Sequence, residues 1–278
     1  MPMALRLTAV ATLLAFAGGC RTSPHPVLEL ATTTSVQNSG LLAVLLPAFE
    51  QVAGIEVRAH AAGSGRALQM LSNGAVDAVI SHSPIAEQRL MPDHPDWSYR
   101  KLAYNWFAVV GPATDPARVR RASDIADAFR RIAESDATFV SRGDQSGTHE
   151  RENLFWEAAG RRPAAARLLV SGRGMAQALR HADEARAYTL ADKPTFWQLG
   201  NRLDLEILFD DDARLLNSYA LIHRAGRAEA MAFAAWLFSD AGRTVLGAFA
   251  VEGRRGFEPW PAGCAAGAPS DLPCRQDE

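Results

Sequence analysis

Two stretches of the chain join hydroxyl side chains to glycine directly before a segment patterned as a helix. The first covers residues 33–40, which begin Thr-Thr-Ser and end Ser-Gly; the second covers residues 142–148, Arg-Gly-Asp-Gln-Ser-Gly-Thr. A helix N-terminus has unpaired N–H groups and partial positive charge, hydroxyls add donors, and glycine lets the backbone approach a ligand. Two such helix starts that face each other predict a binding site for a small oxyanion.

A third polar turn, residues 62–65 with Ser64 in it, offers a further wall for such a site. Arg142 is the one fixed cation in these turns, and its planar guanidinium suits an oxyanion; the alternatives are an ion pair with Asp144 or a surface role. Asp144 would repel a fully ionised anion unless Arg142 neutralises it, but it could accept the proton of hydrogen phosphate. The simplest alternative for the hydroxyls is that each one only caps its helix.

Catalysis and metal binding find less support in the same residues. Asp144, Ser146 and His149 lie close in the sequence, as a Ser/His hydrolase would need, but there is no Gly-x-Ser-x-Gly elbow. His82 and His149 suggest metal ligands, yet no His-Glu-x-x-His pair accompanies them. We therefore expect no catalytic residue and no metal site. A secreted Ser/His hydrolase and a purely structural lipoprotein remain as alternatives.

The first 20 residues have the pattern of an export signal. Arg6 and the amino terminus precede an apolar run, residues 7–17, that is too short to span a membrane as a helix. Small residues before Cys20 resemble a bacterial lipoprotein cleavage box, although Ala17 stands where Leu is commonest. We expect an exported protein, periplasmic or anchored to the membrane by lipid on Cys20, with residues 21–27 as a tether. The alternative is ordinary cleavage and a free Cys20.

The overall composition is that of an ordinary globular protein. The 278 residues carry 29 basic and 31 acidic side chains, a formal net charge of −2, which offers no basic face to a nucleic acid. Cys264 and Cys274 bracket a Gly/Ala/Pro-rich stretch, so an oxidising compartment would allow a disulfide between them. Residues 258–278 are predicted to form a C-terminal tail, and the protein is expected to be a monomer.

Strands, polar turns and helices alternate along the first part of the chain. Strands are predicted at 27–31, 55–60 and 77–81, and helices at 41–52 and 66–71, with a kink or a late start at Pro47. This order implies parallel strands with helices on both faces, and ligands bind beyond the carboxyl ends of such strands. Further strands are predicted at 104–111, 138–140, 187–190, 205–209 and 218–223, with a loop-like chain beyond Gly253.

Several of these segments together resemble the TupA-type tungstate-binding proteins, which are type II periplasmic binding proteins of ABC importers. The most specific motif is Arg-Gly-Asp-x-Ser-Gly-Thr-His at 142–149, and the Thr-Thr-Thr-Ser turn at 32–35 accompanies it. The resemblance covers about residues 28–222. Its other motifs are the Leu-rich run with Pro47 at 41–50, Gly63-Ser64-Gly65, residues 104–112, Gly172-Arg173-Gly174-Met175 and residues 188–192.

The resemblance implies an α/β fold of two lobes, each a mostly parallel sheet flanked by helices, with the ligand in the cleft between them. Lobe 1 would comprise residues 28–111 and 205–257, and lobe 2 residues 112–204. The ligand would be tungstate or molybdate, with a phosphate- or sulfate-type oxyanion as the alternative; no cofactor is implied, and the partner would be an ABC importer permease. The implied ligand donors are Thr33, Thr34, Ser35, Ser64, Arg142, Ser146, Gly147 and Thr148.

Three positions depart from the family pattern. Ser64 stands where Thr is frequent, Arg173 stands where Gln is commoner, and Asp192-Lys193-Pro194 replaces the usual Asp-Arg-x. Arg173 would add a second cation near the cleft. We expect Arg142, and not Arg173, to supply most of the charge that holds the ligand.

Overall fold

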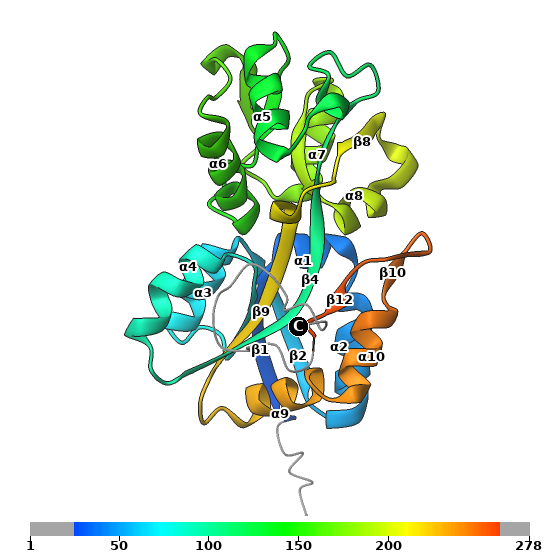
Figure 1. Cartoon of the computed structure of the whole chain (residues 1–278). Coiled ribbons are helices and arrows are strands. Elements are labelled where there is room, and N and C mark those ends of the chain that lie inside the picture. The colour runs from blue at the N-terminus through cyan, green and yellow to red at the C-terminus, as the bar shows by residue number, and fades with distance from the viewer. Residues whose placement is uncertain (1–24, 262–278) are drawn as a thin grey trace, which may run out of the picture.

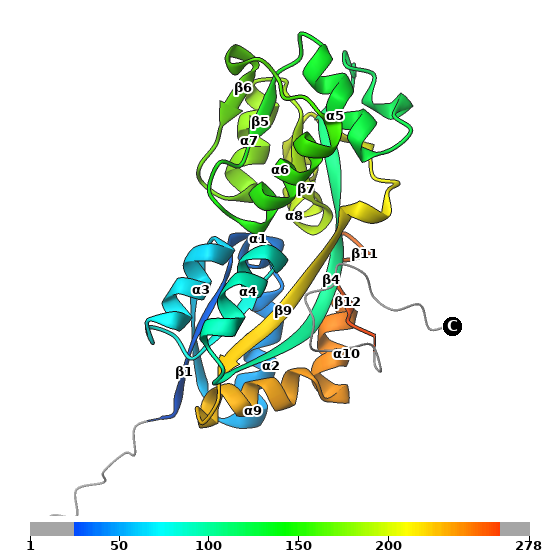
Figure 2. The same cartoon turned by 60° about the vertical axis from the view of Figure 1, so that its left-hand side comes forward.

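The computed structural model describes residues 25–261, which form two α/β lobes joined by two long strands, β4 and β9 (Figures 1 and 2). Cys20, Cys264 and Cys274, and with them the predicted signal, lipid anchor and disulfide, lie outside the described residues. Within residues 25–261, none of the helices is both long enough and apolar enough to cross a membrane.

The first lobe is built on a mixed sheet with the strand order β12-β4-β9-β3-β1-β2. The early strands are parallel, as the alternation of strand and helix predicts: β1 pairs with both β2 and β3 in that sense. The later strands β9, β4 and β12 join them antiparallel. The strands are β1 (Val27–Thr33), β2 (Glu56–Ala62), β3 (Ala78–Ser81), β4 (Trp97–Pro112), β9 (Leu216–Arg224) and β12 (Glu258–Pro259).

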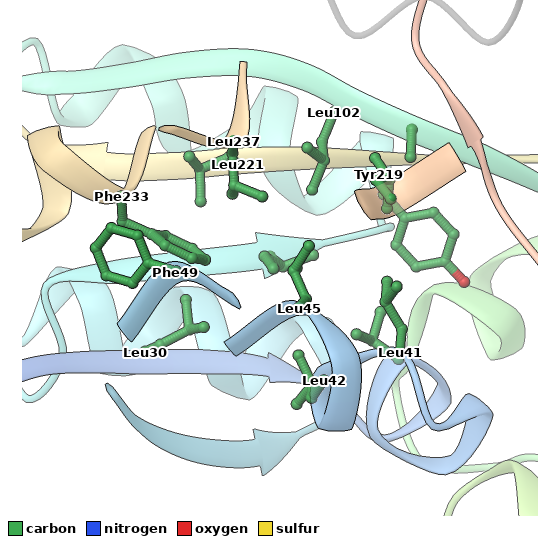
Figure 3. Packing of buried hydrophobic residues seen from close by; sticks show 14 of the residues in the cluster. Leu30, Leu41, Leu42, Leu45, Phe49, Leu102, Tyr219, Leu221, Phe233 and Leu237 are labelled. Carbon is green, nitrogen blue, oxygen red and sulfur yellow. The ribbon is translucent and has the colours of Figure 1, made fainter. Parts of the chain in front are cut away.

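Helices cover both faces of this sheet because its central strands are apolar on both sides. In β9, Tyr219 and Leu221 pack into one core, whereas Ala220 and Ile222 pack into the other. The first core is closed by α2, α9 and α10 (Figure 3). The second lies under α3 and α4. The helices of this lobe are α1 (Thr34–Ser39), α2 (Leu42–Ala53), α3 (Ser64–Ser72), α4 (Pro84–Leu90), α9 (Ala228–Leu237) and α10 (Asp240–Ala248).

The second lobe uses the far end of β4. Phe107 and Val109 face a core shared with α5 and α6, and Ala108 and Val110 face a core shared with α7. Strands β7 and β8 pair antiparallel with β4, and β5 pairs parallel with β6. The elements are α5 (Ile125–Glu134), β5 (Phe139–Ser141), α6 (Gly147–Ala159), β6 (Leu168–Val170), α7 (Met175–Glu184), β7 (Thr189–Asp192), α8 (Lys193–Leu199) and β8 (Leu205–Phe209).

The strand pairing moves both expected lobe boundaries: the first crossing lies at 106/107 and not at 111/112, and the second lies at 215/216 and not at 204/205. Trp106 of β4 still pairs with β9, and from Phe107 onward β4 pairs with β7 and β8. We therefore define the first lobe as residues 25–106 and 216–261, and the second lobe as residues 107–215. The expectation that 205–209 belongs to the first lobe is wrong, because β8 pairs with residues 109–112 and Leu205 lies in the α7 core.

The carboxyl-terminal segment is more ordered than its composition predicts. Residues 250–251 (β10) and 254–255 (β11) form a short hairpin. β12 pairs with β4, and Trp260 is buried, so residues 258–261 belong to the first lobe and not to a tail. Pro47 lies inside the continuous helix α2, and the segment before it forms a separate short helix, α1. Single 3₁₀ turns occupy Met91–Asp93, Val119–Arg121, Ala165–Arg167, Gly200–Arg202 and Ala213–Leu215.

Candidate functional site

The turn after β1 uses its hydroxyls in different ways. Thr33 is the N-cap of α1, and its Oγ1 accepts the N–H of Val36 at 3.3 Å. Thr34 is half-buried and lines an open cavity. Ser35 is buried, and its Oγ has no hydrogen-bond partner. The hydroxyl of Thr33 therefore stabilises the helix, whereas that of Ser35 remains free to donate. This turn lies at the edge of the first lobe that faces the second (Figure 2).

The turn after β5 is organised around an ion pair. Arg142 is only 1% exposed, and its Nε and Nη2 donate to Oδ2 of Asp144 at 3.2 and 2.6 Å. The other carboxylate oxygen, Oδ1, accepts the N–H of Ser146 at 3.2 Å. Gly143 has φ 56°, and a Cβ there would lie 2.3 Å from Val170 Cγ1, so this tight turn requires glycine.

Asp144 neutralises one edge of the Arg142 guanidinium. Burial raises the pKa of the Asp144 carboxyl, but the charge of Arg142 and the hydrogen bonds from Ser146 outweigh it and hold that pKa below its usual value. The carboxylate is thus ionised at neutral pH. The remaining nitrogen, Nη1 of Arg142, is buried and has no hydrogen-bond partner. The pair therefore presents one charged donor without an unpaired negative charge beside it.

The start of α6 is pressed against the first lobe. Ser146 is the N-cap, and its Oγ accepts the N–H of His149 at 3.3 Å. Gly147 follows, and a Cβ on it would lie 2.1 Å from the backbone oxygen of His82 in the first lobe. Ser64, at the start of α3, is fully buried, and its Oγ accepts the N–H of His82 at 3.4 Å. The turn at Ser64 and the start of α6, two of the predicted parts of the site, thus both contact His82.

Three of the residues predicted as ligand donors have a buried donor without a partner: Ser35 Oγ from the first lobe, and Arg142 Nη1 and Thr148 Oγ1 from the second. Thr32 Oγ1, at the end of β1, is a further buried hydroxyl without a partner. Buried polar groups in proteins are nearly always hydrogen-bonded, and an unsatisfied one costs about 1–3 kcal/mol. Such an arrangement of hydroxyls and one guanidinium nitrogen suits a small anion that accepts hydrogen bonds.

Two titratable side chains near this cluster were not predicted as part of it. Burial raises the pKa of Asp192 to about 6, against hydrogen bonds from Thr195 and the charge of Arg142. Its Oδ1 is buried and unpartnered, and Thr195 Oγ1 contacts the backbone oxygen of Ser35 at 3.4 Å. Burial lowers the pKa of His82 to about 4, so this ring is neutral at physiological pH. The sequence signal for Asp192 is the N-cap position after a strand.

A buried amide network supports His82 where the strands cross between the lobes. His82 Nδ1 lies 2.9 Å from Asn217 Oδ1, and Asn217 Nδ2 donates to Asn105 Oδ1 and to the Tyr219 hydroxyl, both at 2.8 Å. Asn105 and Asn217 are register partners on β4 and β9. Sequence reasoning missed this network because its members are far apart along the chain.

Two cavities flank the line along which the lobes meet. One, of about 720 Å³, is lined by Thr34 and Arg66 of the first lobe and by Asp144 and Arg173 of the second. We call it the arginine cavity. The other, of about 400 Å³, is lined by residues that include Ser83, Ile85 and Glu150. We call it the Glu150 cavity. Between the two cavities, Gly63 and Gly65 of the first lobe lie against residues 144–146 of the second.

The arrangement around Ser146 differs from that of a hydrolase nucleophile. The Ser146 hydroxyl accepts a backbone N–H of His149, and the His149 ring accepts the backbone N–H of Gln145 at 3.2 Å. A nucleophilic serine would instead donate to the ring of its base. Within residues 25–261, no group of three or more His, Cys, Asp or Glu side chains could hold a metal ion. Ser146 and His149 therefore lack the mutual contact of a nucleophile and its base.

Comparison with known proteins defines the class to which this fold and site belong. Residues 22–241 match the family model described as "PBP superfamily domain". That match spans most of the chain, so the protein belongs to the PBP superfamily. The two lobes and the strands that cross between them agree with this assignment.

More specific relatives share most of the sequence. "Tungstate-binding protein TupA" of Peptoclostridium acidaminophilum is 36% identical over 266 residues, which cover 88% of this chain and 93% of the relative. A crystal structure described as the tungstate ABC transporter from Geobacter sulfurreducens is 35% identical, with a TM-score of 0.73 over 80% of this chain and 98% of that one. The tungstate-binding protein TupA from Desulfovibrio alaskensis G20 is 35% identical, with a TM-score of 0.70 over 84% of this chain and 98% of that one.

Proposed function

We propose that this protein is the extracytoplasmic receptor of an ABC importer and captures tungstate, or its near analogue molybdate, between its two lobes. The observation that carries the proposal is the set of three buried, unpartnered donors: Ser35 Oγ, Arg142 Nη1 and Thr148 Oγ1. A fully ionised tetrahedral oxyanion accepts hydrogen bonds through every oxygen and would satisfy all three. The names of the relatives support tungstate as the ligand.

The other predicted donors have secondary roles in this proposal. Ser64 can donate its hydroxyl hydrogen while its oxygen accepts from His82. Gly147 opens α6, so its N–H is among those that have no partner inside the helix. The hydroxyl oxygens of Thr33 and Ser146 accept backbone N–H groups as caps, and the N–H of Ser146 donates to Asp144, so in this proposal these two residues mainly hold the turns in place. Thr34 lines the approach from the arginine cavity.

Binding couples the ligand to the arrangement of the lobes. Donors from both lobes would contact one anion, so the ligand stabilises the state in which the lobes meet. We propose that this closed state is the one that the permease of the importer recognises. Export by the first 20 residues, lipid on Cys20, a Cys264–Cys274 disulfide and a monomeric state complete the proposal. No cofactor and no catalytic step are needed for it.

Calorimetric titration against tungstate, molybdate, phosphate and sulfate tests the proposal. We expect saturable binding of tungstate or molybdate at micromolar concentration or below, together with a rise in melting temperature, because a ligand that binds only the folded protein stabilises it. Thr148→Val, which removes one donor at nearly constant volume, should weaken binding about tenfold. Absence of binding and of a melting shift with all four anions would overturn the receptor function.

The hydrolase alternative is tested in the same preparation. Turnover of a chromogenic ester that disappears in Ser146→Ala would contradict the receptor proposal. We expect no such turnover, since the Ser146 hydroxyl is engaged with the backbone of α6. A phosphate- or sulfate-type receptor would instead show its tightest binding with one of those anions in the calorimetric panel.

A further inference from the structure

Glu150 forms hydrogen bonds across the gap between the lobes. It lies in the first turn of α6 in the second lobe, and its carboxylate accepts the Ser83 hydroxyl and, at 3.1 Å, the N–H of Ile85. Both donors belong to the start of α4 in the first lobe. The contact therefore exists only while the two lobes are close together.

The first-lobe side of this contact is firmly held. Ser83 is buried, and its N–H donates to Oε1 of Glu87 at 3.0 Å. Oε2 of Glu87 accepts the Tyr99 hydroxyl at 2.9 Å, which ties α4 to strand β4. Pro84 has no N–H, so Ile85 presents the first free amide of the helix beyond Ser83. A carboxylate that accepts both donors satisfies groups that would otherwise need water.

Glu150 lies apart from the three unpartnered donors: none of them lines the Glu150 cavity, although the predicted donor Ser146 does. Glu150 lines this cavity with Ile85 and Asn153, whereas Thr34 and Asp144 line the arginine cavity on the other side. Its two oxygens are already engaged with the first lobe. It therefore acts on the position of the lobes and not on the anion itself.

We propose that Glu150 is an interlobe latch, which holds the lobes together through Ser83 and Ile85 and thereby sets the affinity and the release rate of the bound anion. The proposal rests on the proposed receptor function for its effect on affinity. If the anion binds the closed state, its apparent affinity is proportional to the closed fraction. Charge-assisted hydrogen bonds that form only on closure raise that fraction and slow the opening.

The direction in which tungstate affinity changes when Glu150 is removed distinguishes a latch from a carboxylate that acts on the anion only by charge repulsion. A carboxylate near a dianion repels it, so its removal alone would tighten binding. Loss of the latch has the opposite effect. We expect Glu150→Ala to weaken tungstate binding about 10- to 100-fold and to raise the dissociation rate by most of that factor.

The experiment compares wild type with Glu150→Ala, Glu150→Gln, Ser83→Ala and, as a matched control, Glu157→Gln. Glu157 is an exposed acidic residue farther along the same helix. Tungstate affinity is measured by calorimetry, dissociation by stopped flow, and the radius of gyration by solution scattering with and without tungstate. Ser83→Ala and Glu150→Ala together should weaken binding by less than the product of their separate effects, because both break one contact.

The latch proposal predicts two results of the solution scattering. Ligand-free Glu150→Ala should have a larger radius of gyration than ligand-free wild type, and saturating tungstate should return both to the same compact value. Affinity and dissociation rate within twofold of wild type, with an unchanged radius, would overturn the proposal, as would tighter binding. If wild type binds none of the anions, the receptor function fails, and the ligand-free scattering alone then decides for or against the latch.

Discussion

The two cavities beside the site differ in how the lobes meet around them. At the Glu150 cavity, a carboxylate from α6 is hydrogen-bonded to the start of α4. At the arginine cavity, Arg66 and Arg173 approach from opposite lobes, both are exposed, and within residues 25–261 neither has an ion pair. One edge of the interface is thus joined by contacts, and the other carries unpaired positive charge beside the larger opening. We expect that anions reach the proposed donors from the arginine side.

Arg142→Ala should have the largest effect on binding, because it removes the buried charged donor behind the arginine cavity. It also leaves the half-buried Asp144 without its partner. We expect a loss of about 10³-fold in tungstate affinity by calorimetry, consistent with the loss of a buried hydrogen-bonded charge. Urea unfolding of the ligand-free variant should show a free energy of unfolding lower by about 3 kcal/mol.

Arg173→Ala is the matched comparison on the rim of the same cavity. Its guanidinium is exposed, so its truncation should lower the association rate only a few-fold, and less so as salt is added. A larger loss of affinity in Arg173→Ala than in Arg142→Ala would show that the ligand is held in the cavity and not at the buried donors.

Gly147→Ala tests the contact line between the two cavities. Its Cβ would lie 2.1 Å from the backbone oxygen of His82, so the lobes must separate to make room. We expect about 100-fold weaker tungstate binding and a larger radius of gyration at saturating ligand, while the free energy of unfolding changes by less than about 1 kcal/mol, since Ala favours helix. Gly65→Ala is the control, because its Cβ would lie 3.6 Å from Gln145 O. Equal affinities in the two variants would contradict this contact.

The smallest effect is expected from pH, acting through Asp192. Burial raises its pKa to about 6, so the folded protein favours the protonated form; this contribution to stability is complete below the unfolded pKa near 4 and is lost as pH rises through 6. The nearby His82 ring, with a pKa of about 4, stays neutral in this range and does not contribute to the pH dependence. A bound dianion should raise the Asp192 pKa further, so tungstate affinity should increase a few-fold from pH 8 to pH 6.

Asp192→Asn keeps the helix cap and removes the titration. Its affinity should be nearly independent of pH over the same interval. Calorimetry in buffers with different ionisation enthalpies measures the proton uptake directly. Equal uptake by wild type and Asp192→Asn would assign the pH dependence to another group.

The parts of this molecule that sequence reasoning reached are those encoded by neighbouring residues. Hydroxyl-rich turns before helices marked the starts of α3 and α6, and the alternation of strand and helix indicated an α/β fold, whereas residues 34–39, predicted as part of a turn, form the short helix α1. The residues missed depend on long-range contacts: Ser83 and Glu150 are 67 positions apart, and Asn105 and Asn217 are 112 apart. Which hydroxyl serves as a cap and which stays free likewise depends on the opposite lobe.

The placement of β8 and β12 was wrong for a related reason. A short apolar strand pairs with whichever edge the topology presents, and the 16 residues of β4 present edges to both lobes. Only the pairing with residues 109–112 assigns β8 to the second lobe. Only the pairing with Tyr104 and Ala103 makes a strand of Glu258–Pro259, in a segment whose composition predicts a tail.

The shared strand β4 also determines the order in which the lobes can be completed. Residues 107–215 are one unbroken stretch, whereas the first lobe needs β9, which lies between β4 and β3 in its sheet. During synthesis the chain leaves the ribosome amino end first. The whole second lobe has therefore emerged before β9 is available to complete the sheet of the first lobe. Domains often fold from the amino terminus onward during synthesis. Here the lobe that begins the chain is the last to become complete: β1, β2 and β3 can pair with one another, but β3 and β4 must wait for β9, which lies between them.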